Sequence, residues 1–249
     1  MGQEREASRL VEQARTAVAS EGWYLMEPDA VAGCLGIGVG EFGCLASHWE
    51  ELAVDPYAAE RGTRRMRRYG SYELSANGTV RAKGHETFVQ PQNSNPLYVD
   101  RARRFEPLTE KFCAEPALDA LIRLLGQVAR GLDGTPEWEV KVHPFRVAAQ
   151  TSGDGEPAPE GRHKDGVTLV SSLLIGRENV DGGRSTLYGP NGKETAAVTL
   201  SAPGSLLLSD DRATWHDVSP IRPLDPARPA HRDVLVTTLL AQHPQPAGR

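Results

Sequence analysis

The chain has 249 residues, of which 39% are hydrophobic and 24% charged, and its net charge is −5. This length suffices for one large domain with a sizeable core, and the composition is typical of an ordinary soluble protein. The negative charge argues against a general phosphate-binding surface, and no apolar run is long enough to span a membrane, so we expect neither nucleic acid nor membrane as a partner. The first residues do not resemble a signal peptide and the three cysteines are widely spaced, which favours a reducing cytoplasm.

The first part of the chain is predicted to be mostly helical. Residues 4–20 carry apolar side chains at helical spacing along one side. In the glycine-rich stretch that follows, Gly38, Gly40 and Gly43 match the letters of a dinucleotide-binding fingerprint. Because no convincing strand precedes these glycines and no acidic residue closes a following strand, we interpret them as a loop leading into a helix around residues 42–52.

Three features lie between residues 61 and 98. Five arginines in residues 61–68 form a basic cluster, which we interpret as a solvated face or as partners of the surplus acidic side chains. Alternating residues from Tyr72 to Thr87, around an Asn-Gly pair, predict a hairpin at which the strands begin. The polar stretch 90–98 is a loop that could form part of a pocket wall.

The clearest helix is predicted over residues 116–132, where an apolar stripe should lie against a sheet and two glycines follow. A strand then runs from Trp138 toward Gln150, with apolar residues at every second position. His143 is out of phase with those apolar residues, so we interpret it as an exposed strand residue and not as a metal ligand.

The rest of the chain alternates between turns and short strands. Residues 151–162 are rich in Pro, Gly and acidic side chains and could form a mobile lid. A nearly continuous apolar run over 167–175 suits a buried strand. Short strands separated by turns indicate an antiparallel sandwich or barrel; they are expected at residues 185–188, 196–200 and 205–209.

These elements predict a mainly β protein with flanking helices (α+β) and a double-stranded β-helix, or jelly-roll, core. We expect one domain over residues 1–249, with a mostly helical part over 1–70 and a core over 71–241 buttressed by the 116–132 helix. Residues 242–249 are expected to be a disordered tail.

A candidate metal site is centred on the segment from Glu160 to Gly166. In an extended segment His163 and Asp165 point the same way, so an imidazole and a carboxylate can bind one ion. His216 is the best candidate for a third ligand. Two His and one carboxylate leave three coordination positions open, the arrangement typical of non-haem Fe(II) oxygenases.

A candidate anion-binding residue, Arg232, opens the apolar run that follows the second histidine. A guanidinium at the base of a buried strand can hold a carboxylate with two parallel hydrogen bonds. Arg222 is the alternative, but it lies in a Pro-rich link. We prefer Arg232 because it shares a strand face with Val234 and Val236, which should point into the barrel.

In this order, H-x-D, a distal His and a later Arg resemble the Fe(II)/2-oxoglutarate-dependent dioxygenases, and in particular the bacterial branch that contains free amino-acid hydroxylases of the isoleucine type. The resemblance covers about residues 140–241, with a weaker likeness in YVDRARRFEPL toward residue 97. The stretches that carry it are PEGRHKDG, RENVDGGRSTLYGPNG, DDRATWHDVSPI and HRDVLVTTL.

The resemblance implies the same jelly-roll fold and a reaction that uses Fe(II), 2-oxoglutarate and O₂. It implies that His163, Asp165 and His216 bind iron and that Arg232 binds the far carboxylate of 2-oxoglutarate. Because halogenating members lack the carboxylate ligand, Asp165 favours hydroxylation; desaturation and ring closure share these ligands and stay open.

The resemblance also implies a small-molecule substrate, a free L-amino acid or a close derivative. Glu160 could then bind its ammonium group and Arg146 its carboxylate. One alternative is a cupin-like metal-binding sensor without redox turnover, and another is the same chemistry on a carrier-bound or other natural-product intermediate. The sequence determines neither the carbon attacked nor the oligomeric state.

Overall fold

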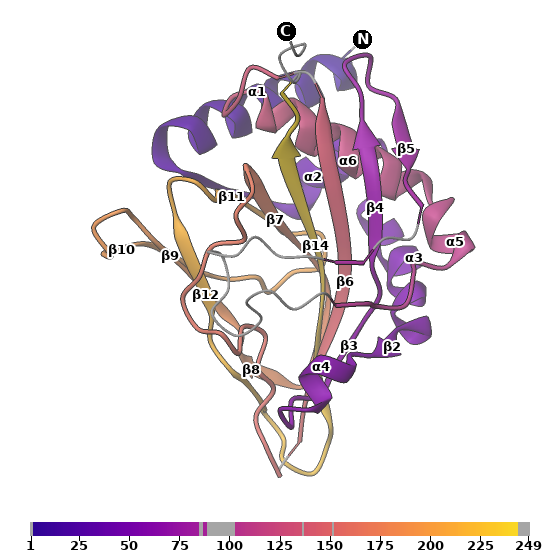
Figure 1. Cartoon of the computed structure of the whole chain (residues 1–249), viewed down its shortest axis with the longest axis vertical. Helices are drawn as coiled ribbons and strands as arrows, with labels where there is room; N and C mark the ends of the chain where they lie inside the picture. Colours follow the sequence, from indigo (N-terminus) through magenta and orange to yellow (C-terminus); the bar gives the residue numbers. More distant parts are fainter. Residues whose placement is uncertain (1, 85–86, 89–102, 136, 151, 244–249) are drawn as a thin grey trace, which may run out of the picture.

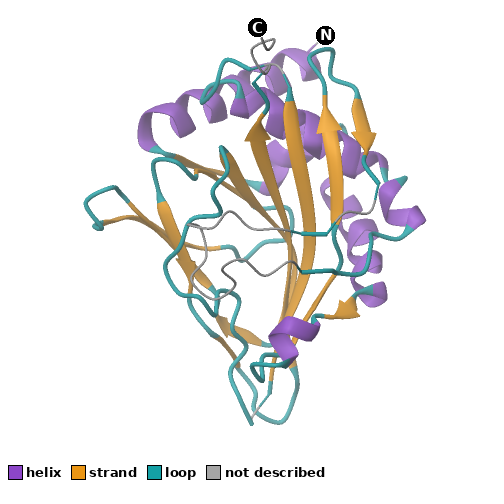
Figure 2. Cartoon of the chain, viewed as in Figure 1, coloured by secondary structure: helices purple, strands orange, loops and turns teal. Residues whose placement is uncertain are grey.

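The structure, a computed structural model of the chain, describes residues 2–84, 87–88, 103–135, 137–150 and 152–243. Two antiparallel sheets face each other, and a layer of helices covers the outer face of the larger sheet (Figures 1 and 2). The helices are α1 (Gly2–Glu21), α2 (Pro28–Leu35), η1 (Val39–Glu41), α3 (Phe42–Ala46), η2 (Ser47–Glu51), α4 (Pro56–Ala59), α5 (Glu110–Cys113) and α6 (Pro116–Ala129). The strands are β1 (Trp23–Met26), β2 (Ala53–Val54), β3 (Arg65–Arg67), β4 (Gly70–Leu74), β5 (Val80–Ala82), β6 (Trp138–Ala149), β7 (Leu169–Glu178), β8 (Val180–Gly182), β9 (Arg184–Tyr188), β10 (Glu194–Thr199), β11 (Leu206–Asp210), β12 (Trp215–Val218), β13 (Ile221–Pro223) and β14 (Ala230–Ala241).

Within the described residues, the larger sheet has nine strands in the order β1-β11-β7-β14-β6-β3-β2, with β4 also paired to β6 and β5 to β4. The smaller sheet has the order β10-β9-β12, and β13 pairs with β8. The two sheets enclose an apolar cluster that includes Leu174 and Val234 from one and Leu187 from the other. This arrangement confirms the predicted jelly-roll core with flanking helices.

The long central strand β6 has two different faces, because successive side chains of a strand point to opposite sides. Trp138, Val140 and Val142 are buried against the helices, in the same cluster as the apolar stripe of α6. The alternate side chains, Lys141 and His143 among them, line a cavity between the two sheets. The outer face of the larger sheet therefore holds the fold together, and its inner face is available for a site.

Helix α6 confirms the helix predicted over residues 116–132, ending within three residues of the expected boundary. Pro116 occupies its first turn, where a missing N–H costs nothing. Gly126 lets the helix approach the sheet closely, because a Cβ there would lie 2.1 Å from Leu74 Cδ2. The helix thus covers β4 and β6 at short range.

The predicted hairpin forms between β4 and β5, and Gly78 adopts the positive φ of 83° that its turn requires. The expectation that strands begin there is wrong, because three strands come earlier. β1 pairs with β11 at one edge of the larger sheet, and β3 pairs with β6. Strands of two to four residues among helices are too short to show a recognisable period.

The glycine-rich stretch forms η1 and α3, in agreement with a loop leading into a helix. Cys34, Cys44 and Cys113 are all free thiols. Among the described residues, no helix combines the length and apolar character that crossing a membrane requires. The predicted polar loop at 90–98 and most of the expected tail lie outside the described residues.

Candidate active site

The segment that carries H-x-D lies beside strand β12. The backbones of His163 and His216 exchange two hydrogen bonds, with N–O distances of 2.9 and 3.0 Å, in an isolated antiparallel bridge. β12 is itself fixed by pairing with β9 in the smaller sheet. Residues far apart in sequence are therefore held directly opposite each other by backbone hydrogen bonds.

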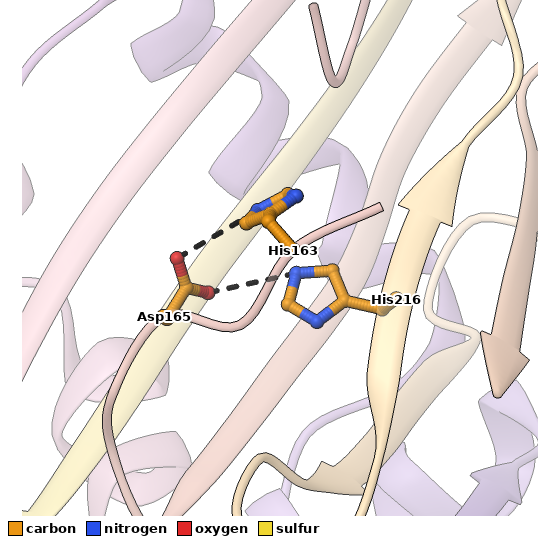
Figure 3. A group of neighbouring side chains, drawn as sticks. All are labelled: His163, Asp165 and His216. Carbon is orange, nitrogen blue, oxygen red and sulfur yellow. Dashed lines mark ion pairs between the residues drawn. The ribbon is translucent and has the colours of Figure 1, made fainter. Parts of the chain in front are cut away.

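The side chains of His163, Asp165 and His216 converge at this point (Figure 3). Asp165 Oδ1 lies 3.9 Å from His163 Nε2, and Asp165 Oδ2 lies 3.7 Å from His216 Nε2. One ligand atom from each residue falls within 4.8 Å of the others. Two atoms bound at right angles to one ion are about 3 Å apart, so side-chain shifts of about 1 Å would close these three around a metal. The donor set fits a facial iron site.

The two imidazoles are prepared to act as neutral ligands. His163 Nδ1 lies 2.8 Å from the carbonyl oxygen of Gly161, to which an Nδ1–H would donate, leaving Nε2 as a ligand atom. Burial, and next the neighbouring His163, lowers the pKa of His216 to about 4. Burial raises the pKa of the Asp165 carboxyl group, and a cation bound next to it would lower that pKa again.

A second carboxylate, Asp211, holds the turn that carries Asp165. Its Oδ1 accepts the backbone N–H of Asp165 at 3.0 Å, and its Oδ2 accepts those of Gly166 and Val167 at 2.7 and 3.0 Å. Asp211 Oδ1 also lies 3.8 Å from His216 Nδ1. Sequence reasoning missed this residue, although an acidic residue five positions before the distal histidine was a visible signal.

Arg232 is buried and lines the cavity together with Val234 and Val236, as its place on β14 predicted. Its Nε has no hydrogen-bond partner among the residues that the structure describes. Gly183 makes room for the side chain, because a Cβ there would lie 3.0 Å from Arg232 Cδ. Burial, and next the charge of Arg177, lowers the pKa of Arg232 to about 10. A buried cation of this kind suits an anionic ligand.

Arg222, the alternative to Arg232, has a different position. Its side chain is 68% exposed, and its Nε donates to Asp154 Oδ2 at 2.8 Å. It is not among the described residues that line the cavity. The structure therefore favours Arg232 as the arginine available to a ligand in the cavity.

The two residues predicted to bind substrate differ in position. Glu160 lines the cavity, with its Oε1 3.5 Å from His163 Nε2. Arg146 points away from the described cavity lining, with its guanidinium bound to Asp233 through two contacts of 2.8 Å and to Glu50 at 2.9 Å. This placement does not support Arg146 as a ligand of the substrate.

The interpretation of His143 as an exposed residue is wrong. His143 is only 5% exposed and lines the cavity, because the β6 face opposite the helices is covered by the second sheet. The basic cluster is divided: Arg65 forms the expected kind of ion pair, with Asp55 at 2.8 Å, but Arg65 and Arg67 on β3 are buried and line the cavity, so this part of the cluster is not a solvated face. Arg61 and Arg64 are exposed, as expected. Alternation within residues 64–68 was the signal that could have separated the buried arginines from the exposed ones.

The loop predicted as a lid borders the cavity through Pro157, Ala158 and Glu160. It is joined to the body of the protein at Gly155, which exchanges backbone hydrogen bonds of 2.9 and 2.8 Å with Ile221. The loop is therefore held at Gly155 by backbone hydrogen bonds to Ile221.

Comparisons with known proteins agree with this geometry. A family model described as 2OG-Fe dioxygenase matches residues 46–238. Among solved structures, a BsmA homologue from Methylobium petroleophilum PM1 is 33% identical and has a TM-score of 0.85, over 94% of this chain and 96% of that one. The Fe(II)/α-ketoglutarate-dependent dioxygenase TqaL is 20% identical, with a TM-score of 0.74 over 96% and 89% of the two chains.

IDO from Bacillus thuringiensis is 16% identical, with a TM-score of 0.73 over 94% and 96% of the two chains. At these lower identities, TqaL and IDO show a shared fold alone. A search of curated proteins gave no match.

Proposed function

The chain belongs to the 2OG-Fe dioxygenase family, whose members use Fe(II), 2-oxoglutarate and O₂, and we propose that it hydroxylates an unactivated C–H bond of a free L-amino acid or a close derivative. The observation that carries the proposal is the convergence of two imidazoles and one carboxylate at the wall of a buried cavity. Family membership also makes a metal-binding sensor without turnover the weaker alternative.

We assign His163, Asp165 and His216 as the residues that hold Fe(II). Nitrogen and oxygen donors in this ratio suit iron and leave three positions for other ligands. When bound, the metal and 2-oxoglutarate supply the oxidising power: the co-substrate is decarboxylated to succinate and one oxygen atom of O₂ enters the substrate. The chain's own contribution is to orient the ligands, anchor both organic molecules and keep bulk water out of the cavity.

Arg232 is the proposed partner of the C5 carboxylate of 2-oxoglutarate. It lies on the inner face of β14 in the same cavity as the three metal-ligand candidates. Its Nε, which has no partner in the described ranges of the chain, offers a hydrogen bond that a carboxylate can accept, and a guanidinium can hold both carboxylate oxygens at once.

The amino-acid substrate is proposed on charge. Glu160 presents a carboxylate to the cavity beside His163, where it could bind an ammonium group. The inner faces of β3 and β6 present cationic side chains to the same cavity. A zwitterion has complementary charges for both. The three free thiols agree with the cytoplasmic location that we propose.

The test is a screen of free L-amino acids for Fe(II)-dependent succinate release, followed by mass analysis of the amino acid. We expect at least one of them to gain one oxygen atom in step with succinate. His216→Ala should remove nearly all turnover and most iron binding, whereas His231→Ala, at a histidine outside the described cavity lining, should retain both. Full activity of His216→Ala would refute the ligand assignment, and turnover only with a carrier-bound intermediate would refute the amino-acid class.

A further inference from the structure

Part of the cavity is lined by cationic and aromatic side chains to which neither iron nor 2-oxoglutarate has been assigned. They come from β3 and β6 and from two further residues, Phe88 and Arg103, and the two phenylalanines among them are Phe88 and Phe145. We call this part the cationic chamber; its charged and titratable members are Arg65, Arg67, Arg103, Lys141 and His143.

Among the residues that the structure describes, one carboxylate, that of Asp55, forms ion pairs with the two β3 arginines. Asp55 is completely buried, and its Oδ2 lies 2.8 Å from Arg65 Nη2 but 3.9 Å from Arg67 Nη1. Its Oδ1 is occupied by the backbone N–H groups of Tyr57 and Ala58. Asp55 is therefore the close partner of Arg65, and within the described residues Arg67 has no carboxylate oxygen nearer than 3.9 Å.

The guanidinium of Arg67 is rigidly oriented. Its Cζ lies 3.6 Å from the ring centroid of Phe105 and 4.5 Å from that of Phe145, and its Nη2 lies 2.6 Å from His143 Nδ1. The residue is 4% exposed, and its Nε has no hydrogen-bond partner within the described part of the chain. A buried cation with an unused N–H is costly unless an anion completes it.

His143 extends this donor surface. Because its Nδ1 accepts from Arg67, we assign the ring proton to Nε2, which can donate to a ligand. Burial, followed by the charges of Arg67 and Lys141, holds the pKa of His143 well below its usual range. The imidazole is thus a neutral donor beside a fixed cation.

The chamber is separate from the position proposed for 2-oxoglutarate. Arg232, Val147 and Arg65 form one row across β14, β6 and β3, and Val234, Phe145 and Arg67 form the next. The backbones of strands two apart are about 10 Å from each other, and Arg67 lies one row further along the strands than Arg232. On this register we assign the two arginines to different anions.

We infer that the cationic chamber binds a carboxylate of the substrate, with Arg67 as its main partner and His143 as a second donor. This inference rests on the proposed oxygenase function and names the class of substrate: a small carboxylate, whose primary amide is rejected. If the substrate is an amino acid, its α-carboxylate binds Arg67, and not Arg146 as the sequence had suggested.

The inference is tested by calorimetric titration of the Fe(II)- and 2-oxoglutarate-loaded protein without O₂. The probes are aliphatic L-amino acids, their N-acetyl derivatives and their primary amides. We expect at least one acid to bind and its amide to bind about 30-fold more weakly or worse, as for loss of a buried charged contact. Arg67→Gln should weaken acid binding to the same degree. Arg64→Gln removes a charge from the same segment at an exposed position and should change nothing.

Equal binding of acid and amide, or unchanged acid binding by Arg67→Gln, would overturn the inference. So would a panel in which none of the acids binds. The comparison of acid with amide uses the unmodified protein, so it decides the question even if Arg67→Gln does not fold. The titration contains no O₂ and therefore measures binding alone. If an acid binds in the chamber but is not hydroxylated when air is admitted, the proposed function is refuted and the carboxylate site is retained.

Discussion

Arg232 shows how much depends on a single buried guanidinium. Replacing it with Gln removes a buried, charge-assisted contact, which costs about 2–5 kcal/mol. The half-saturating concentration of 2-oxoglutarate should therefore rise by tens-fold or more, while iron affinity is unchanged. Arg222→Gln, at an exposed ion pair with Asp154, is the matched control. If Arg222→Gln has the larger effect on 2-oxoglutarate, the wrong arginine has been chosen.

Asp211 is a second single residue on which the site depends, because it positions Asp165 through backbone hydrogen bonds. It accepts the N–H groups of Asp165 and the two residues that follow, so Asp211→Asn replaces one acceptor oxygen by a donor and loosens the turn. Groups that support metal ligands typically contribute about 10- to 100-fold in metal affinity. We expect a loss of that size in an Fe(II) titration of the apoprotein.

The neighbouring Asp210 provides the control for Asp211. Its side chain accepts from Arg212 instead of the turn that carries Asp165. Asp210→Asn should therefore keep the iron affinity of the unmodified protein. Equal affinities for all three proteins would show that Asp211 has no positioning role.

At the scale of elements, the loop before the metal-ligand segment depends on one small residue. A Cβ at Gly155 would lie 2.7 Å from Ile221 Cγ1 and 2.8 Å from the carbonyl oxygen of Ala148. Because one of these atoms belongs to the backbone, Gly155→Ala must displace the loop. We expect destabilisation of about 1–3 kcal/mol, measured by thermal unfolding, and faster proteolysis within residues 152–162.

Gly153, two residues earlier, is the matched control for Gly155. Nothing lies within 4 Å of a Cβ built there, so Gly153→Ala should be neutral or slightly stabilising. If the two variants unfold at the same temperature, the contact between Gly155 and Ile221 does not hold the loop.

At the scale of the whole molecule, burying His143 beside arginines links stability to pH. The pKa of His143 is well below its usual value in the folded protein, so the unfolded chain takes up a proton that the folded chain does not. As the pH is lowered below about 6.5, the free energy of unfolding therefore decreases, by about 1 kcal/mol between pH 6.5 and 5.5 for one such group. His143→Asn keeps an acceptor for Arg67 and should lose this share of the acid dependence. Parallel stability curves for both proteins between pH 7 and 5.5 would contradict this.

The sequence by itself determined the elements whose patterns are local. The apolar stripe of α6, the hairpin around Asn77 and Gly78 and the alternation of β6 follow from side-chain spacing within each element. The sequence was also sufficient to identify His163, Asp165 and His216 as candidate metal ligands, because their residue types and order indicate one kind of chemistry. The structure brings these three side chains together.

Only the tertiary structure decided which face of a strand meets a helix, a cavity or solvent. His143 appeared exposed because alternation separates two faces without saying what covers each. The guanidinium of Arg146 is paired with the carboxylate of Asp233, its cross-strand partner on β14. That pairing depends on a strand register that the sequence does not show. Arg67 could not be distinguished from the other arginines of its run, because only the structure shows that Asp55 lies 2.8 Å from Arg65 but 3.9 Å from Arg67. Charge compensation is a property of three-dimensional distance, and for that reason the sequence alone could not assign it.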